Sequence, residues 1–192
     1  MNYIGSKLSL IPFIRAAVED CVGIDLSDRV FCDLFAGTGV VGRSFKSRVR
    51  KVISNDWEYY SYVLNRNYIG NNIALDSQDE LVRELNEMAG VEGGFIFQNY
   101  CYGSGSGRQY FSDENGKKID AIRIQIERWK NNDYISEDMY FFLLATLLES
   151  ADKLANTASV YGAFLKHLKA AAQKSLILEP AYFSTNSNKH EV

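Results

Sequence analysis

Apolar residues fall into short runs in the first third of the chain, and each run is followed by a helical pattern. Residues 29–35 (RVFCDLF) and 51–56 (KVISND) have the composition of short strands. Residues 40–49 and 58–70 space their apolar side chains as helices do, and a further helix is predicted from about Pro12 to Cys21. Strands that alternate with helices are typical of a parallel sheet with crossover helices. The sequence therefore predicts an α/β fold over residues 1–74.

The pattern changes at about Leu75 and becomes mostly helical. Helices are predicted at 77–90, 117–132 and 136–156, and 168–180 favours a helix that gives way to a strand. Residues 93–118 predict a long Gly-, Tyr- and Phe-rich loop with room for a short strand, and loops of this length tend to be functional or mobile. The sequence therefore predicts three segments. Residues 1–74 form the α/β segment, residues 75–172 a helical and loop region, and residues 173–192 a return strand with an unstructured polar tail.

A glycine turn joins the first predicted strand to the next helix. Gly37, Gly39 and Gly42 match the dinucleotide fingerprint G-x-G-x-x-G in its required setting between a strand and a helix. Glycines let the backbone approach a ligand, and the helix N-terminus favours a negative group. Asp56 ends the next strand about 20 residues on, where an acid would bind ribose hydroxyls. A nicotinamide or flavin cofactor is one interpretation, which would make the chain part of an oxidoreductase.

Two features favour S-adenosylmethionine instead. Asp33 lies inside the strand, four residues before Gly37, and strands that bind dinucleotides are usually apolar throughout. A carboxylate there suits a cofactor that carries a sulfonium and a free amino group. The segment NYIGSK at 2–7 adds Lys7, which could meet the cofactor carboxylate, although a plain N-terminal cap explains the segment equally well.

Three segments in this order, NYIGSK, DLFAGTGVVG and SNDWEYYS, resemble the opening of the Dam-like type II DNA adenine-N6 methyltransferases. RQYFSDENGKKIDAIRIQIERW at 108–129 and NTASVYGAFLK at 156–166 resemble the recognition-side segments of restriction–modification methylases. The resemblance covers most of the chain. It implies an incomplete Rossmann-like S-adenosylmethionine-dependent fold with a mostly helical target-recognition region at 75–172, and site-specific methylation of adenine N6 in double-stranded DNA.

The resemblance also implies a set of cofactor contacts. The N-terminal residues would meet the methionine end, Asp33 the methionyl amine, the turn would line the pocket, Asp56 would hold the ribose hydroxyls and Trp57 the adenine ring. Simple core packing is the alternative for Trp57 and Tyr59. In chain order the implied set is Tyr3, Gly5, Ser6, Lys7, Asp33, Phe35, Ala36, Gly37, Thr38, Gly39, Asp56 and Trp57.

The catalytic D-P-P-Y-type tetrapeptide of that family is absent. The chain has two prolines, Pro12 and Pro180, and they are not adjacent. EPAY at 179–182 is rejected as a decayed version, because Glu179 would reach differently and the second proline is missing. No catalytic residue is therefore assigned, and we expect a fragment or split subunit that partners the missing catalytic segment and methylates little alone. A non-catalytic cofactor- or DNA-binding regulatory fragment is the main alternative.

Candidate DNA contacts lie in two segments of the recognition region. The glycine-rich loop offers cations for phosphates and aromatic rings for bases, and the segment after 155 offers polar side chains and lysines. A flexible surface loop and a plain helix junction are the alternatives. The candidates are Arg108, Tyr110, Lys117, Asn156, Thr157, Ser159, Tyr161 and Lys166.

Composition and charge exclude several other classes of protein. The net charge of −3 argues weakly against an obligate nucleic-acid binder, although residues 34–55 and 153–178 contain no acid and carry several cations. The three cysteines are widely spaced and fit neither a disulfide framework nor a zinc site, so no metal is expected. No segment has the length of a membrane span or the pattern of a signal peptide. We expect a cytoplasmic protein.

Overall fold

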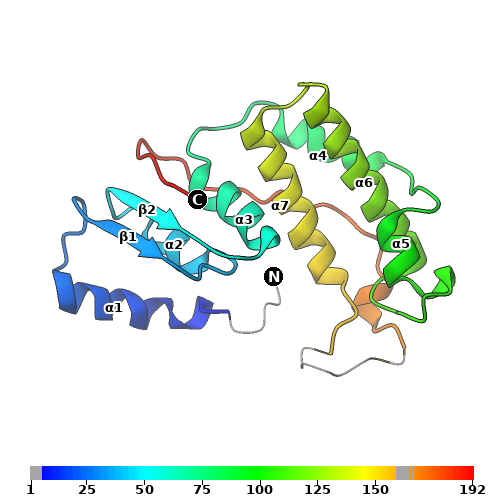
Figure 1. Cartoon of the computed structure of the whole chain (residues 1–192), viewed down its shortest axis with the longest axis horizontal. Helices are drawn as coiled ribbons and strands as arrows, with labels where there is room; N and C mark the ends of the chain where they lie inside the picture. Colours follow the sequence, from blue (N-terminus) through cyan, green and yellow to red (C-terminus); the bar gives the residue numbers. More distant parts are fainter. Residues whose placement is uncertain (1–5, 159–164, 166) are drawn as a thin grey trace. The chain divides into compact units, whose positions relative to one another are not determined.

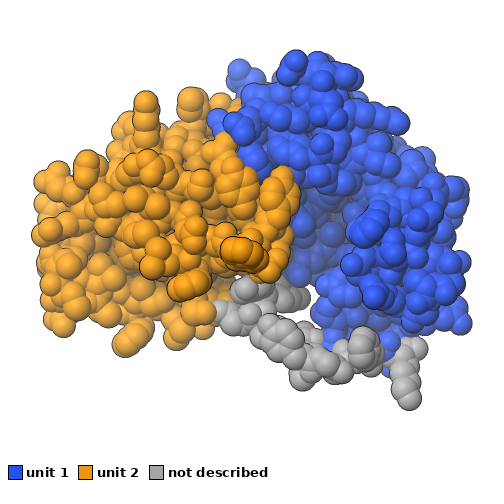
Figure 2. Space-filling model, in the orientation of Figure 1, with its two compact units in different colours: residues 1–4, 76–181 blue, residues 5–75, 182–192 orange. Residues whose placement is uncertain are grey.

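The structure is a computed structural model, and its residues group into two compact units. It describes residues 6–158, 165 and 167–192. Unit 2 comprises residues 6–75 and 182–192, and unit 1 comprises the described residues between 76 and 181 (Figure 2). In sequence, unit 1 is thus an insertion within unit 2.

Unit 2 alternates helices and strands (Figure 1). Its elements are η1 (Leu8–Leu10), α1 (Ile11–Val22), β1 (Val30–Asp33), α2 (Val40–Phe45), β2 (Lys51–Ser54), α3 (Tyr59–Asn65) and the π-helical turn η2 (Arg66–Gly70). β1 and β2 pair in parallel, with Asp33 opposite Ser54, and α2 connects them. The predicted parallel sheet and its crossover helix are confirmed.

The core of unit 2 forms around β2 and α2. The ring of Phe31 on β1 stacks on that of Phe45 on α2, with centroids 4.3 Å apart. α1 adds Ile14 and Val18 to this core but has no fully buried residue, and Phe13 on the same helix is 71% exposed. The buried cluster consists of Leu26, Phe45, Val49, Val52 and Ile69.

The C-terminal tail returns to unit 2 along the edge of β2 that β1 does not use. Glu191 pairs in parallel with Ile53, through hydrogen bonds from its N–H to Val52 O and from Ser54 N–H to its carbonyl, both 2.9 Å. His190 Nδ1 accepts the Val52 N–H at 3.0 Å. The tail was predicted to be unstructured, and this is wrong, because its polar side chains bond to the backbone of unit 2.

A buried lysine joins the tail to the rest of unit 2. Lys46 is 1% exposed. Its Nζ donates to the carbonyls of Tyr68 (3.0 Å), Asn71 (2.5 Å) and Ser184 (2.7 Å). Asn186 Nδ2 donates in turn to the Lys46 carbonyl at 3.0 Å. The residues after 181 are therefore held by specific polar contacts.

Unit 1 is helical. Its elements are α4 (Gln78–Glu87), α5 (Phe95–Tyr100), η3 (Tyr102–Ser104), α6 (Asp113–Asn131), α7 (Glu137–Leu154) and η4 (Ala170–Gln173). α6 and α7 begin at serine caps, where Ser112 Oγ accepts from Asn115 N–H and Ser136 Oγ from Met139 N–H. The two helices pack against each other, and Ile122 on α6 and Phe142 and Leu143 on α7 are fully buried. The predicted long helices are confirmed, but α5 occupies part of the segment predicted to be a loop.

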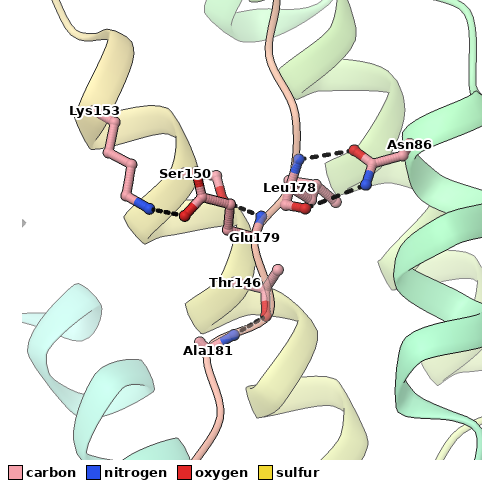
Figure 3. Close-up of polar contacts among 7 residues, drawn as sticks. All are labelled: Asn86, Thr146, Ser150, Lys153, Leu178, Glu179 and Ala181. Atoms are coloured by element: carbon pink, nitrogen blue, oxygen red, sulfur yellow. Dashed lines mark hydrogen bonds and ion pairs between the residues drawn. The ribbon is translucent and has the colours of Figure 1, made fainter.

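Residues 174–181 form an extended strap across unit 1 rather than the predicted return strand. No strand is assigned there, because the backbone pairs with side chains of helices instead of another strand. Asn86 bonds both polar backbone groups of Leu178, Ser150 Oγ accepts Glu179 N–H at 3.0 Å, and Thr146 Oγ1 accepts Ala181 N–H at 3.0 Å (Figure 3).

Candidate functional site

The glycine turn directly follows the end of β1, and hydrogen bonds hold both the N–H and the carbonyl of Gly37 within it. Gly37 and Gly39 have φ of 54° and 73°, in the left-handed region that favours glycine. Gly37 N–H donates to Asp56 Oδ2 at 2.8 Å, and Gly37 O accepts from Ser61 Oγ and from Asn65 Nδ2. Side chains that follow β2 therefore set the conformation of the turn that follows β1.

Gly39 is required for close packing as well as for its conformation. A Cβ at this position would lie 2.6 Å from Asn65 Oδ1. Gly39 N–H also closes the turn by donating to Ala36 O at 2.8 Å, and Ala36 N–H donates to Asn55 O at 3.0 Å. The turn therefore leaves no room for a side chain on the face that meets α3.

Asp33 is a half-buried carboxyl at the carboxyl end of β1. Burial raises its pKa, and the charge of Asp56 adds to this, while hydrogen bonds from the backbone of Phe35 and Gly42 and the charge of Lys7 act in the opposite direction. A carboxylate that is costly to keep charged is stabilised by a cation placed beside it. The site thus favours a positively charged group at Asp33.

Asp56 lies at the carboxyl end of β2, next to the glycine turn. Burial alone would raise the pKa of Asp56, but backbone hydrogen bonds from Glu58 and Gly37 and a side-chain bond from Ser61 lower it overall. Asp56 Oδ2 accepts the Gly37 N–H at 2.8 Å, and Oδ1 accepts the Glu58 N–H at 3.0 Å. Carboxylate oxygens have further lone pairs, so Asp56 is an ionised acceptor suited to hydroxyl groups.

Aromatic side chains of the predicted set are exposed beside the turn. Phe35 is 89% exposed and Trp57 is 96% exposed. Tyr59 is 59% exposed, and its ring stacks on Tyr62 with centroids 6.0 Å apart. Core packing is therefore the wrong alternative for Trp57 and Tyr59. Exposed flat rings beside an acid can stack on a heterocycle.

The other predicted cofactor residues have different positions. Ser6 and Lys7 are exposed just before α1, and Ser6 Oγ accepts Leu8 N–H at 3.4 Å. Ala36 is 7% exposed and Thr38 is half-buried in the turn. Tyr3 and Gly5 lie outside the described residues. From the predicted set, the structure brings together the turn, Asp33 and Asp56, with Lys7 near enough to affect the pKa of Asp33.

The polar residues that hold the glycine turn, Ser54, Ser61 and Asn65, were not among the residues predicted from the sequence. Asn65 is 1% exposed and Ser61 is fully buried. Ser54 Oγ, at the end of β2, donates to Asn65 Oδ1 at 2.6 Å. A signal was present, because Ser61 and Asn65 are four residues apart in an aromatic-rich helix and so share one face. Two small polar side chains on a buried helix face indicate a backbone partner.

Among the predicted DNA contacts, Arg108 and Tyr110 belong to one aromatic cluster in unit 1. The Arg108 guanidinium lies 5.3 Å from the centre of the Tyr100 ring, and Tyr110 meets that ring at 6.1 Å. Tyr110 is 40% exposed, and burial raises the pKa of its hydroxyl. These side chains bring a cation and a phenol hydroxyl into one cluster, and Tyr102 in the same loop is exposed.

Two other candidates are engaged within the chain. Lys117 Nζ forms an ion pair with Glu92 at 2.6 Å. Asn156 is 6% exposed; its Nδ2 donates to Gln109 O and His167 O, and its Oδ1 accepts from Lys169 N–H. We therefore assign Asn156 to holding the backbone rather than to contact with DNA. Thr157 is half-buried, and Ser159, Tyr161 and Lys166 lie outside the described residues.

The first three residues of EPAY (179–181) lie in the strap of Figure 3. Glu179 forms an ion pair with Lys153 at 2.6 Å, and the Glu179 and Ala181 N–H groups bond to hydroxyls of α7. These contacts give the segment a structural role in unit 1.

Within the described residues, no three His, Cys, Asp or Glu side chains gather as a metal site. Cys21, Cys32 and Cys101 are free thiols there. No helix in the same part of the chain combines the length and apolarity of a membrane span.

Comparison with known proteins gives one family. A model of D12 class N6 adenine-specific DNA methyltransferases matches residues 3–192. The chain is 64% identical over 192 residues to the type II methyltransferase M.NlaIII of Neisseria lactamica. The matched region covers all of this chain and 57% of that protein. It is 37% identical to M.FokI of Planomicrobium okeanokoites over 97% of this chain and 30% of that protein.

The chain is also 37% identical to the type II methyltransferase M.CviAII of Paramecium bursaria Chlorella virus 1, over 95% of this chain and 54% of that protein. The chain thus spans at most a little over half the length of these relatives. No solved structure matches it.

Proposed function

The chain belongs to the D12 class N6 adenine-specific DNA methyltransferases, and from this membership we propose that it forms the cofactor-binding and DNA-recognising part of an enzyme that methylates adenine N6 in double-stranded DNA. The relatives named above are type II methyltransferases, which supports a place in a restriction–modification system. The proposed fold is an incomplete Rossmann-like methyltransferase domain, unit 2, with a helical recognition region, unit 1.

The observation that carries this proposal is the grouping of Asp33, the glycine turn and Asp56 at the carboxyl ends of β1 and β2. Ligands of open α/β sheets bind outside the carboxyl ends of the strands. Asp33 supplies the half-buried negative charge and Asp56 the ionised acceptor, and exposed Trp57 supplies a flat ring. This set suits a ligand with a cationic group, ribose hydroxyls and a heterocycle, and S-adenosylmethionine carries all three.

When bound, S-adenosylmethionine supplies a methyl group activated by its sulfonium. Asp33 would hold the methionyl amine, with Lys7 beside it for the carboxylate. Asp56 would accept the ribose hydroxyls, and Trp57 would stack on the adenine ring. The preformed turn would let the backbone approach the ligand without first paying to order it.

DNA recognition is assigned to unit 1. Arg108 offers a cation for a phosphate, and Tyr110 and its neighbouring rings offer surfaces for bases. The target base of such enzymes leaves the duplex before methylation, so aromatic surfaces have a use in this reaction.

The catalytic tetrapeptide is missing from this sequence, so we propose that the transfer step requires a further segment or subunit. Two surface features support this. Among the described residues, β1 pairs with β2 alone, so its other edge is open, and Val30 there is 44% exposed. Leu8, Leu10 and Phe13 at the start of unit 2 are exposed as well. Open strand edges and apolar patches are surfaces that other protein segments cover.

The test is a calorimetric titration of S-adenosylhomocysteine into the purified chain and into Asp33→Asn. Loss of a charge-assisted hydrogen bond is worth about 1.5–3 kcal/mol, so the dissociation constant should rise about 10- to 150-fold. Asp28→Asn, an exposed residue before β1, should leave it unchanged. Binding of NAD in place of S-adenosylhomocysteine, or equal affinity in Asp33→Asn, would refute the cofactor assignment. Methyl transfer into DNA by the chain alone would refute the need for a further segment.

A further inference from the structure

We infer that Asn65 is a positioning residue of the cofactor site: it fixes the carbonyl of Gly37 and, through it, the glycine turn. The inference rests on the proposed function for the identity of the ligand. Its structural part concerns the turn itself and can be tested without any ligand.

The polar atoms of the Asn65 amide are engaged within unit 2. Its Nδ2 donates to Gly37 O at 3.1 Å and to Ser61 O at 2.8 Å. Its Oδ1 accepts from Ser54 Oγ at 2.6 Å. Because both donor hydrogens have partners, Asn65 is not free to bond a ligand by its N–H groups, and it must act through the groups that it holds.

Asn65 connects three elements that position the site. It ends α3, Ser54 ends β2, and Gly37 belongs to the turn after β1. The Gly37 peptide is held at its N–H by Asp56 and at its carbonyl by Asn65 and Ser61. A change at Asn65 therefore alters the turn that would face the cofactor and the carboxylate that would bind its ribose.

Burial and close packing make the arrangement specific. Asn65 is 1% exposed, so a lost partner is not replaced by bulk water. A Cβ at Gly39 would lie 2.6 Å from Asn65 Oδ1, so the turn packs directly on the amide. A side chain at 65 without an amide N–H would leave the Gly37 carbonyl with Ser61 as its remaining side-chain donor.

Three variants separate positioning from general stability. Asn65→Asp keeps the size and the acceptor for Ser54 but puts an oxygen where Gly37 O needs a donor. Ser61→Ala removes the other donor to the same carbonyl. Ser54→Ala, the matched control, removes a buried hydrogen bond from the same cluster without touching Gly37.

The measurements are hydrogen exchange of the ligand-free chain and titration with S-adenosylhomocysteine. In Asn65→Asp and Ser61→Ala, we expect the amides of residues 36–39 to exchange faster while those of β2 keep their protection. The dissociation constant should rise roughly tenfold, the equivalent of one lost hydrogen bond. Ser54→Ala should lower thermal stability but leave the affinity within about twofold.

The outcomes distinguish this inference from the proposed function. Unchanged exchange at residues 36–39 and unchanged affinity in Asn65→Asp would overturn it, as would an equal loss of affinity in Ser54→Ala. If the unmodified chain does not bind S-adenosylhomocysteine, the proposed function fails, and the exchange data still decide whether Asn65 holds the turn. Should Asn65→Asp not fold, Asn65→Ala removes the same donor to Gly37 O without adding a charge, and it carries the test.

Discussion

Replacing Lys46 by Met tests whether the buried ammonium attaches the tail to unit 2. Methionine has a similar length and no charge, so it fills the space but donates nothing to the carbonyls of Tyr68, Asn71 and Ser184. Three hydrogen bonds at about 1.5 kcal/mol each would contribute about 4–5 kcal/mol.

The charge of Lys46 reduces that gain at neutral pH. Burial, aided by the charge of Arg43, lowers the pKa of Lys46 from 10.5 to about 8. This difference corresponds to a cost of about 3 kcal/mol for holding the charged form in the folded state. Lys46→Met should therefore lower the free energy of unfolding by about 1–2 kcal/mol at pH 7.

The pH dependence has a definite sign. Between about pH 8 and 10.5 the unfolded chain keeps a proton on Lys46 that the folded chain has released, so the stability of the unmodified chain rises with pH in this window. Lys46→Met has no proton to release at this position, so its stability lacks this rise with pH. The difference in stability between the two should therefore grow as the pH rises from about 8 to 10.5.

Urea unfolding followed by circular dichroism at pH 7, 8.5 and 10 measures the difference, and pulse proteolysis identifies the unit that opens. Lys189→Met is the control, because Lys189 is exposed on the same tail, and it should change stability by less than about 0.5 kcal/mol. Equal stability of Lys46→Met and the unmodified chain at every pH, or a difference that shrinks as the pH rises, would refute the reasoning.

Two further predictions concern the turn and the tail. Gly39→Ala should destabilise unit 2 by about 1–3 kcal/mol in thermal unfolding, because φ at this position is 73° and the new Cβ would lie 2.6 Å from Asn65 Oδ1. Gly105→Ala is the control: its φ is also positive, but a Cβ there would meet no atom within 4 Å, so it measures backbone strain without the clash. Burial, with the charge of Lys46, lowers the pKa of His190 below 6.5. The unfolded chain therefore takes up the proton first, and stability should fall as the pH drops below 6.5. Exchange of the Val52 amide at pH 7 and pH 5 measures this, and the dependence should disappear in His190→Gln.

Much of the fold could be predicted from local patterns in the sequence. The strand, turn and helix around Gly37 follow from apolar periodicity and glycine spacing, and the helix predicted from residue 136 begins at its Ser136 cap. α6 begins earlier than the predicted residue 117, because Ser112 caps it within the segment predicted to be a loop. The grouping of Asp33 and Asp56 also follows, because parallel strands bring their carboxyl ends to one edge.

Features that depend on distant partners were missed. α5 begins where Asp120 of α6 accepts the N–H groups of Ile96 and Phe97, each at 2.9 Å, and nothing local announces that cap. The strap at 174–181 has the apolar composition of a strand, but side chains such as Asn86 satisfy its backbone. Residues 34–55 were interpreted as an acid-free run that carries cations suited to nucleic acid, but Lys46 within this run is buried.

The discontinuity of unit 2 has a consequence for synthesis. Residues 6–75 leave the ribosome well before residues 182–192, which supply Ser184 for Lys46 and Glu191 for β2. At about 5–20 residues per second, that interval lasts roughly 5–20 s. During that time the edge of β2 that later pairs with Glu191 is unpaired, and Lys46 still lacks the Ser184 carbonyl as an acceptor. The nascent chain is therefore most exposed to wrong strand pairing while the inserted unit is being translated.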